Sequence, residues 1–405
     1  MSLALVTAPA GAGKTAAVIE KICARQRAQP LARVLVIVPS NAHALALRQR
    51  LARQPALLGV ALCEFDTLYR EILDAAGMTV QVLAHAARYR LLRALLRERA
   101  ADGALAYFAP IATKPGLIDA VARFIADAKR ARLLPETLSA IADSPRLRDL
   151  VTVYAAYQQF LHTKNLADDE GIGWLALQAL ENDAACFADF AYIAADGFDE
   201  FDPTQAALLQ QLAARTPELD LTLTYQEGRA AHARFARIVE QFPAAPRRAL
   251  TTTAPPRCDV LDQIERALFE INPPRVPCAD SIQLIAAADR LSEVQTIARA
   301  AKRAILAGAA PSDIAVLFRS LEIYQPLVRE VFTAYDIPFR VRGGMALNSN
   351  PLIAEIINLL ALSANDFPRR ETMDALRAPY FAWRDLDAAA LSDLDRITRE
   401  AVVVR

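Results

Sequence analysis

Short apolar runs alternate with amphipathic segments in the first part of the chain, and this alternation predicts a sheet built from strand–helix repeats. The runs are continuous in apolar residues, which is typical of strands buried on both faces of a parallel sheet. We expect strands at 3–6, 33–38 and 60–62, with helices beginning at 16 and spanning 42–52 between them. Because parallel strands end at the same edge of a sheet, a ligand should bind where these runs end.

Helical periodicity replaces the strand pattern between about residue 85 and residue 166, which we interpret as an all-helical insertion. The helices expected there span 89–100, 116–132 and 147–162. The strand pattern then returns at 190–196 and at 219–225, on either side of a predicted helix at 204–215.

A proline-rich stretch from 242 to 274 indicates a connection between two α/β bodies. In the second body we expect a helix at 291–308 and strands at 281–287, 314–318 and 335–341. The predicted fold class is therefore α/β, with a helical insertion in the first of two α/β bodies.

Composition narrows the function classes. Of 405 residues, 54% are hydrophobic and 23% are charged, which is typical of a globular protein long enough for two or three domains. Lys plus Arg and Asp plus Glu are equal at 46 each, so the chain lacks the bulk positive charge of a strong nucleic-acid binder. Any contact with DNA must come from a local groove.

The cysteines form no C-x-x-C pair, which argues against a zinc site or a disulfide framework and fits a reducing cytosol. No apolar run reaches membrane-spanning length and no signal peptide precedes the first strand, so we expect a cytoplasmic protein without a membrane partner. The cysteines are Cys23, Cys63, Cys186, Cys258 and Cys278.

The segment from Ala8 to Thr15, with the sequence APAGAGKT, has the pattern of a phosphate-binding P-loop between the first strand and its helix. Backbone N–H groups in such a loop close around phosphates, and the helix adds its positive N-terminal end. Lys14 would reach the β- and γ-phosphates of ATP, and Thr15 would offer its hydroxyl to Mg²⁺. A glycine-rich turn with a surface lysine is the alternative. The expected ATP-binding residues are Ala10, Gly11, Ala12, Gly13, Lys14 and Thr15.

An acidic residue, Asp196, closes the strand predicted at 190–196. In P-loop enzymes an aspartate at this position holds Mg²⁺. We therefore expect Thr15 and Asp196 together to form the Mg²⁺ site.

These motifs resemble those of superfamily 1 helicases of the UvrD kind. The resemblance rests on the P-loop with an alanine opening, the second motif at Ser40-Asn41, the aromatic turn at Phe65, and the segments 311–320 and 336–344. Within that superfamily the chain is most similar to the AddB subunits of AddAB helicase-nucleases. Asp196-Gly197-Phe198 resembles an AddB-like pattern, where an active helicase has Asp-Glu-x-Gln-Asp.

The resemblance implies two RecA-like lobes, the second of them incomplete. Residues 1–84 and 166–275 would form the first, ATP-binding lobe and the linker, and 85–165 its helical insertion. Residues 276–350 would form part of the second lobe, and 351–405 the start of a further helical insertion. The late arginine motif and the nuclease domain with its iron–sulphur cluster are not found before Arg405, so we expect an N-terminal fragment or a truncated relative.

Hydrolysis of ATP requires a group that orients the attacking water, usually a glutamate directly after the Mg²⁺-binding aspartate. Gly197 occupies that position and cannot act. Asp199 or Glu200 would serve only if their loop bent inward; helix capping or solvent exposure explains both acids more simply. Arg257 and Arg319 are candidate phosphate-contacting arginines, although either is also explained as a solvated side chain.

The resemblance places Ser40 and Asn41 against the DNA backbone and Phe65 beside the bases, and Arg319 is a further candidate DNA contact. The alternative for Phe65 is a core position. The resulting hypothesis is an ATP-binding, AddB-like subunit that binds single-stranded DNA or DNA ends with an AddA-like partner, in the repair of broken DNA. Two alternatives stay open: an active ATP-dependent translocase, and a nucleotide-responsive scaffold that does not turn ATP over.

Overall fold

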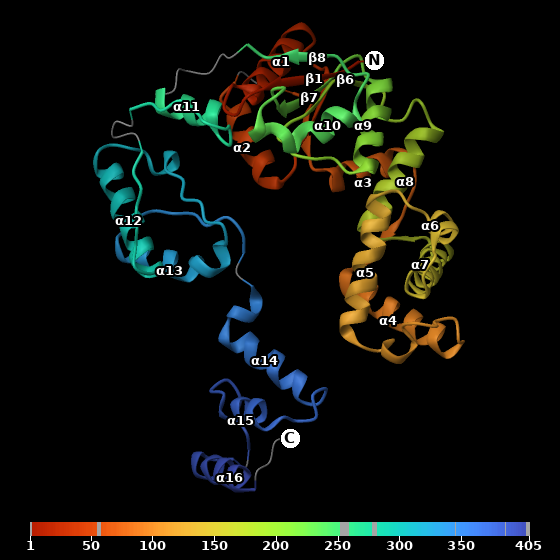
Figure 1. Cartoon of the computed structure of the whole chain (residues 1–405), viewed down its shortest axis with the longest axis vertical. Coiled ribbons are helices and arrows are strands. Elements are labelled where there is room, and N and C mark those ends of the chain that lie inside the picture. The colour runs from red at the N-terminus through yellow and green to blue at the C-terminus, as the bar shows by residue number, and fades with distance from the viewer. Residues whose placement is uncertain are drawn as a thin grey trace. The chain divides into compact units, whose positions relative to one another are not determined.

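The computed structural model describes residues 2–54, 58–251, 259–277, 282–344, 346–384 and 386–401. The chain divides into two compact units, residues 1–281 and residues 282–405 (Figure 1). None of the helices in the described part of the chain is long and apolar enough to cross a membrane.

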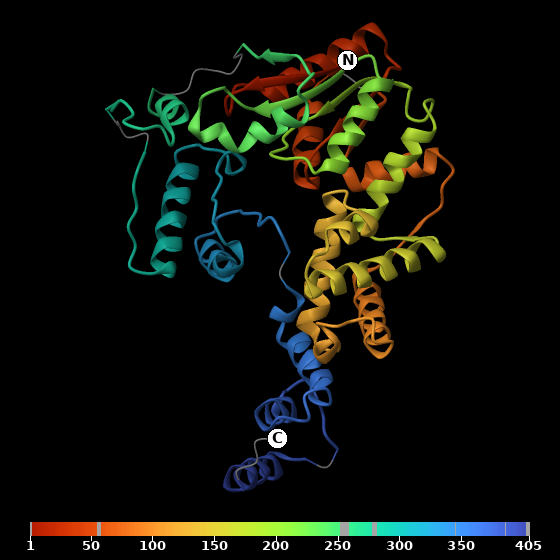
Figure 2. The ribbon, with the colours of Figure 1, turned by 45° about the vertical axis from the view of Figure 1, so that its right-hand side comes forward.

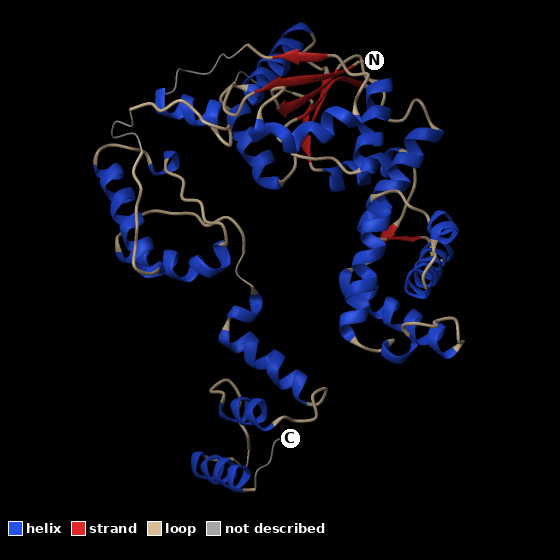
Figure 3. Cartoon of the chain, in the orientation of Figure 1, coloured by secondary structure: helices blue, strands red, loops and turns tan. Residues whose placement is uncertain are grey.

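A six-stranded parallel sheet forms the centre of the first unit (Figure 3). Its strand order is β3-β2-β6-β7-β1-β8, so one strand, β7, lies between β1 and β6. All five strands expected in this unit are confirmed. Their continuous apolar runs fit a parallel sheet whose two faces are both covered by helices. The strands are β1 (Leu3–Ala8), β2 (Arg33–Ile37), β3 (Val60–Cys63), β6 (Phe190–Ala195), β7 (Leu219–Thr224) and β8 (Arg247–Ala249).

Helices cover both faces of the sheet. On one face α1 (Lys14–Ala28) and α2 (Asn41–Leu51) pack on β2 and β6 through a core that includes Ile22, Val36 and Leu47. The other face is buried in a larger core under α3 (Phe65–Ala75), α8 (Asp169–Asn182), α9 (Pro203–Arg215) and α10 (Ala236–Gln241). The first unit also contains η2 (Ala230–Phe235) and α11 (Asp259–Ala267).

The segment between α3 and α8 folds into a helical body with its own core (Figure 2). The three helices expected there are confirmed, and their apolar faces meet around the fully buried rings of Tyr154 and Tyr157. A short parallel pair of strands closes the two ends of the segment. The elements are β4 (Gln81–Val82), α4 (His85–Ala101), η1 (Ala109–Ile111), α5 (Pro115–Arg130), α6 (Pro135–Ile141), α7 (Pro145–Thr163) and β5 (Leu166–Ala167).

A buried ion pair joins this helical body to α8, one of the helices that cover the sheet. Lys129 on α5 donates to the carboxylate of Asp168, the N-cap of α8, at 2.7 Å, and both side chains are almost fully buried. The hydroxyl of Tyr157 and the N–H of Gly171 also donate to Asp168, at 3.0 and 2.8 Å. Burial lowers the pKa of Lys129, against the attraction of the carboxylate. Burial would raise the pKa of Asp168, but the charge and hydrogen bond of Lys129, the charge of Arg88 and the N–H of Gly171 together hold that pKa below its ordinary value.

The second unit is helical where the structure describes it. A small core that includes Val294, Val328 and Phe332 joins α12 to α13. The helix expected at 291–308 is confirmed as α12. The elements are α12 (Arg290–Leu306), η3 (Pro311–Asp313), α13 (Leu321–Ala334), η4 (Leu347–Ser349), α14 (Pro351–Leu362), α15 (Arg369–Arg377) and α16 (Ala388–Glu400).

The strands expected in the second unit are not formed. Between residues 282 and 344, all of which are described, no residue belongs to a strand. Leu284 and Leu317, which we expected inside a sheet, are 100% and 88% exposed. A helix satisfies its backbone groups locally, whereas a strand must pair with a neighbouring strand. These segments of the second unit have the apolar pattern of strands, but in the described residues no neighbouring strand pairs with them.

Candidate functional site

The loop between β1 and α1 has the backbone of an anion-binding turn. Gly11 and Gly13 have φ values of 68° and 92°, in the left-handed region that favours glycine. Gly13 is the N-cap of α1 and, as a glycine, has no side chain with which to cap the helix. The first turn of α1 also contains no acidic residue. The positive end of this helix is therefore not neutralised by an acid of its own first turn, and such an end attracts anions.

Lys14 lies over this loop. Its Nζ donates to the carbonyl oxygen of Pro9 at 2.9 Å and to that of Ala8 at 3.3 Å. The side chain is only partly buried, so its ammonium lies at the mouth of the loop and can exchange these carbonyls for a phosphate oxygen.

Asp196 is the centre of the site. It is 7% exposed and follows β6, where its N–H donates to the carbonyl oxygen of Ile37 at 3.0 Å. The hydroxyl of Thr15 donates to one carboxylate oxygen at 2.7 Å, and the hydroxyl of Thr222 on β7 donates to the other. Carboxylate and hydroxyl oxygens are ligands that suit Mg²⁺, so these residues fit the ion that the motif implies. Elsewhere in the described residues, no group of three or more His, Cys, Asp or Glu side chains could hold a metal.

Two residues of β7 contribute to this region although the sequence analysis missed them. Thr222 binds Asp196, and Asp220 anchors α1 through Lys21, whose Nζ lies 2.5 Å from the Asp220 carboxylate. The hydroxyl of Tyr192 donates to the same carboxylate at 3.0 Å, and burial together with this charge raises the pKa of the tyrosine. The sequence signal that could have identified them is the alternation of polar and apolar residues along β7, which has the sequence LDLTLT.

Gly197, directly after Asp196, has a φ of 89°. A Cβ atom added there would lie 3.4 Å from Cδ2 of His43 and 3.6 Å from Cδ of Pro39. These are ordinary van der Waals contacts, but a residue with a side chain would be strained by the left-handed backbone conformation. The position where an active helicase has its glutamate is thus shaped for glycine.

The two acids that follow do not turn inward. Asp199 and Glu200 are both exposed, and Asp199 forms an ion pair with Arg234 at 2.5 Å. The aromatic residues of the same loop, Phe198 and Phe201, are the buried ones. The loop therefore presents its acids to solvent in this conformation, as expected if Asp199 and Glu200 are solvent-exposed side chains and do not orient water.

Ser40 and Asn41 lie at the same sheet edge as Asp196, since Ile37 at the end of β2 pairs with Ala195 at the end of β6. Ser40 is the N-cap of α2, and its Oγ lies 2.8 Å from Nδ1 of His43. Asn41 begins α2 and is exposed. The strand ends thus place these two residues at the same edge of the sheet as Asp196.

Phe65 is a core residue, which corrects its expected role beside DNA bases. It is 6% exposed, and its ring centroid lies 5.4 Å from that of Phe198 and 6.1 Å from that of Phe201. A ring enclosed in an aromatic cluster presents no face to a base, so the structure favours the core alternative for Phe65. Arg319 belongs to the second unit and is exposed, and Arg257 lies outside the described residues.

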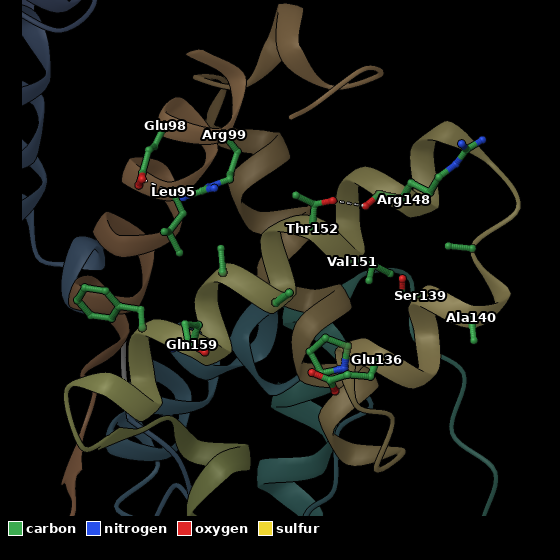
Figure 4. A pocket seen from close by; sticks show the side chains of 15 residues that line it. Leu95, Glu98, Arg99, Glu136, Ser139, Ala140, Arg148, Val151, Thr152 and Gln159 are labelled. Atoms are coloured by element: carbon green, nitrogen blue, oxygen red, sulfur yellow. Dashed lines mark hydrogen bonds and ion pairs between the residues drawn. The ribbon is translucent and has the colours of Figure 1, made fainter. Parts of the chain in front are cut away.

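A groove of about 1260 Å³ lies elsewhere, on the helical body between α4, α6 and α7 (Figure 4). Two of its polar side chains are engaged within the helical body: Glu98 binds Arg99 at 2.9 Å, and the hydroxyl of Thr152 donates to the carbonyl oxygen of Arg148 at 2.8 Å. It lacks the glycine-rich loop at a helix N-terminus that is found at the strand ends.

Comparison with known proteins finds a match to the family model "ADDB, N-terminal" over residues 5–241. A protein of Moorella thermoacetica is 29% identical over 87% of this chain and 33% of its own length. Proteins of Bacillus licheniformis and Desulfitobacterium hafniense are each 23% identical, over 89% and 94% of this chain and 34% of their own lengths. All three are named as one subunit of an "ATP-dependent helicase/deoxyribonuclease". The chain spans about a third of the length of these relatives.

Proposed function

This chain belongs to the AddB N-terminal family, and on that premise we propose that it is the ATP-binding and single-stranded-DNA-binding region of a helicase–nuclease subunit. It would act on DNA ends in the cytoplasm, with an AddA-like subunit as its partner. The observation that carries the proposal is the bonding of Asp196 to Thr15 and Thr222, which connects the P-loop helix to two strands of the sheet.

The first unit would be a RecA-like lobe with the helical body as its insertion, and the second unit part of another such lobe. Lys14 and the N–H groups at the start of α1 would hold the phosphates of ATP, and Thr15 with Asp196 would hold Mg²⁺. A bound nucleotide would supply negative charge that the positive end of α1 can neutralise. Titration of a fluorescent ATP analogue into the chain, with and without Mg²⁺, tests this proposal.

ATP turnover should be weak in this chain. Gly197 leaves no residue directly after Asp196 to orient water, and Asp199 is bound to Arg234. Loss of a general base typically lowers the reaction rate by a factor of about 10²–10⁴. With single-stranded DNA present, we expect the unaltered chain to release phosphate at a rate well below roughly one per second. The Lys14→Ala variant measures the background rate.

A DNA-stimulated rate of about one per second or faster that Lys14→Ala abolishes would instead show an active translocase. Asp199→Asn and Glu200→Gln would then identify which acid orients the water. ATP binding with neither turnover nor binding to DNA would point to the scaffold alternative.

Asn41 should contribute to the binding of single strands. Its exposed amide at the strand-end edge can bond to a phosphate or a base, so Asn41→Ala should weaken binding by roughly two- to tenfold, the value of a single neutral hydrogen bond. The salt dependence should not change, because no charge is removed. Fluorescence anisotropy with a labelled oligonucleotide measures both quantities. The matched control is Gln49→Ala, another exposed amide on α2, and equal effects of the two variants would remove Asn41 from the interface.

A further inference from the structure

The helical body has a net positive charge, although the net charge of the whole chain is zero. Residues 85–165 contain thirteen Lys and Arg against seven Asp and Glu, a surplus of six positive charges, although the complete sequence is balanced at 46 each. A local surplus of this kind produces a field over one part of the surface even when the net charge is zero.

Part of this charge lies in a row on α4. Arg90, Arg93 and Arg97 are three and four residues apart, so they occupy neighbouring turns of one helix face. All three are exposed, and the opposite face of α4 is buried in the helical core through Leu92, Leu95 and Leu96. With a rise of about 1.5 Å per residue, the row spans roughly 10 Å. We refer to these three residues as the α4 arginine stripe.

The other charges of α4 are engaged elsewhere. Arg99 binds both acids of the helix end, Glu98 at 2.9 Å and Asp102 at 3.9 Å. Arg88 turns the other way and binds Glu170 of α8 at 3.2 Å. In the part of the chain that the structure describes, no carboxylate lies within ion-pair distance of the α4 arginine stripe. Its charge is therefore available to an anion from outside.

We propose that the α4 arginine stripe binds the sugar–phosphate backbone of duplex DNA without regard to sequence. Arginine suits this role because its guanidinium matches the geometry of a phosphate. Phosphates of one strand follow each other at about 3.4 Å along the duplex axis, so a row of roughly 10 Å can cover about three of them. The inference rests on the proposed function for DNA as the partner, but it uses a surface separate from the strand-end site.

A duplex is favoured over a single strand because the stripe lacks a stacking surface. Binding of single strands draws much of its free energy from bases stacked on aromatic rings. Tyr89 is the aromatic residue of α4, and it packs against the helical core. The stripe thus offers charge without stacking, which is the chemistry of contact with a duplex backbone.

The test compares two triple variants that remove the same charge. The first is Arg90→Gln, Arg93→Gln and Arg97→Gln, which keeps good helix formers on α4. The control is Lys114→Gln, Arg146→Gln and Lys164→Gln, which removes three exposed charges of the same body that lie on other elements. Anisotropy of a labelled blunt duplex is measured at several salt concentrations, and circular dichroism and the melting temperature verify the fold of each variant.

The stripe variant should bind the duplex at least about tenfold more weakly at 100 mM salt, and its log–log salt slope should fall by about 2.7, near 0.9 for each lost phosphate contact. The control should stay within about twofold of the unaltered chain. Equal loss in both variants, an unchanged stripe variant or no duplex binding by the unaltered chain would overturn the inference. Failure of the proposed function is separate: it appears as absent binding of ATP and single strands, while stripe-dependent duplex binding persists.

Discussion

Replacing Lys14 with alanine should weaken the binding of a fluorescent ATP analogue by roughly tenfold to a hundredfold. A hydrogen bond to a charged group contributes about 1.5–3 kcal/mol, and each 1.4 kcal/mol is about tenfold in affinity. Lys14 lies at the loop mouth, where it now bonds to the carbonyl oxygens of Ala8 and Pro9. Its loss removes the one side-chain cation that the P-loop motif places among the phosphates. Anisotropy or intensity titration in the presence of Mg²⁺ provides the affinity.

The matched control is Arg27→Ala, which removes an exposed cation from the last turn of the same helix. It should leave the affinity for the nucleotide nearly unchanged, because screening in salt weakens any effect over the length of α1. If Lys14→Ala and Arg27→Ala bind the analogue as tightly as the unaltered chain, the P-loop does not hold ATP. Equal weakening in the two variants would indicate non-specific attraction of the anion.

Replacing Lys129 with methionine should destabilise the first unit by about 3–5 kcal/mol, because it leaves the buried carboxylate of Asp168 without its cation. Lys129 is 0% exposed and Asp168 is 1% exposed, so water cannot compensate for the lost partner. Tyr157 and Gly171 continue to donate to Asp168 but bring no positive charge. The main effect should be on the junction of the helical body with α8.

Trp174 on α8 reports on this junction, since its indole N–H donates to the carbonyl oxygen of Lys129 at 3.0 Å. Urea unfolding followed by its fluorescence, in a Trp383→Phe background, gives the local free energy of unfolding. The control is Arg130→Met, whose half-exposed side chain should account for about 1 kcal/mol or less. Adding Asp168→Asn to Lys129→Met should recover part of the loss. A midpoint unchanged by Lys129→Met would show that the pair does not stabilise the junction.

The strand and helix pattern of the first unit could be predicted because it depends on local periodicity. Each apolar run of the sheet fits only a strand covered on both faces, and the glycines at 11 and 13 allow the turn into α1 that the motif requires. Parallel order then brings the ends of β2 and β6 to one edge, which is why Ser40 and Asn41 could be expected near Asp196.

Local pattern could not place the residues that meet across the fold. The sequence allows Phe65 to be either a DNA contact or a core residue. Only its packing against Phe198 and Phe201 in the folded chain distinguishes the two roles. Thr222 reaches Asp196 because β7 lies beside β6, a neighbour relation that depends on the order of the sheet. In the second unit the apolar runs have a strand pattern but no described partner, and a strand without a partner does not form.

By itself, the sequence determined the alternation of strands and helices and the position of the P-loop, because side-chain periodicity and glycine content act over a few residues. The tertiary structure alone decided that Lys129 pairs with Asp168 and that the acids after Gly197 point to solvent. It also decided that three arginines of α4 keep their charge free of carboxylates in the described residues. These outcomes depend on which distant groups share a low-dielectric interior or a surface, and no local pattern contains that information.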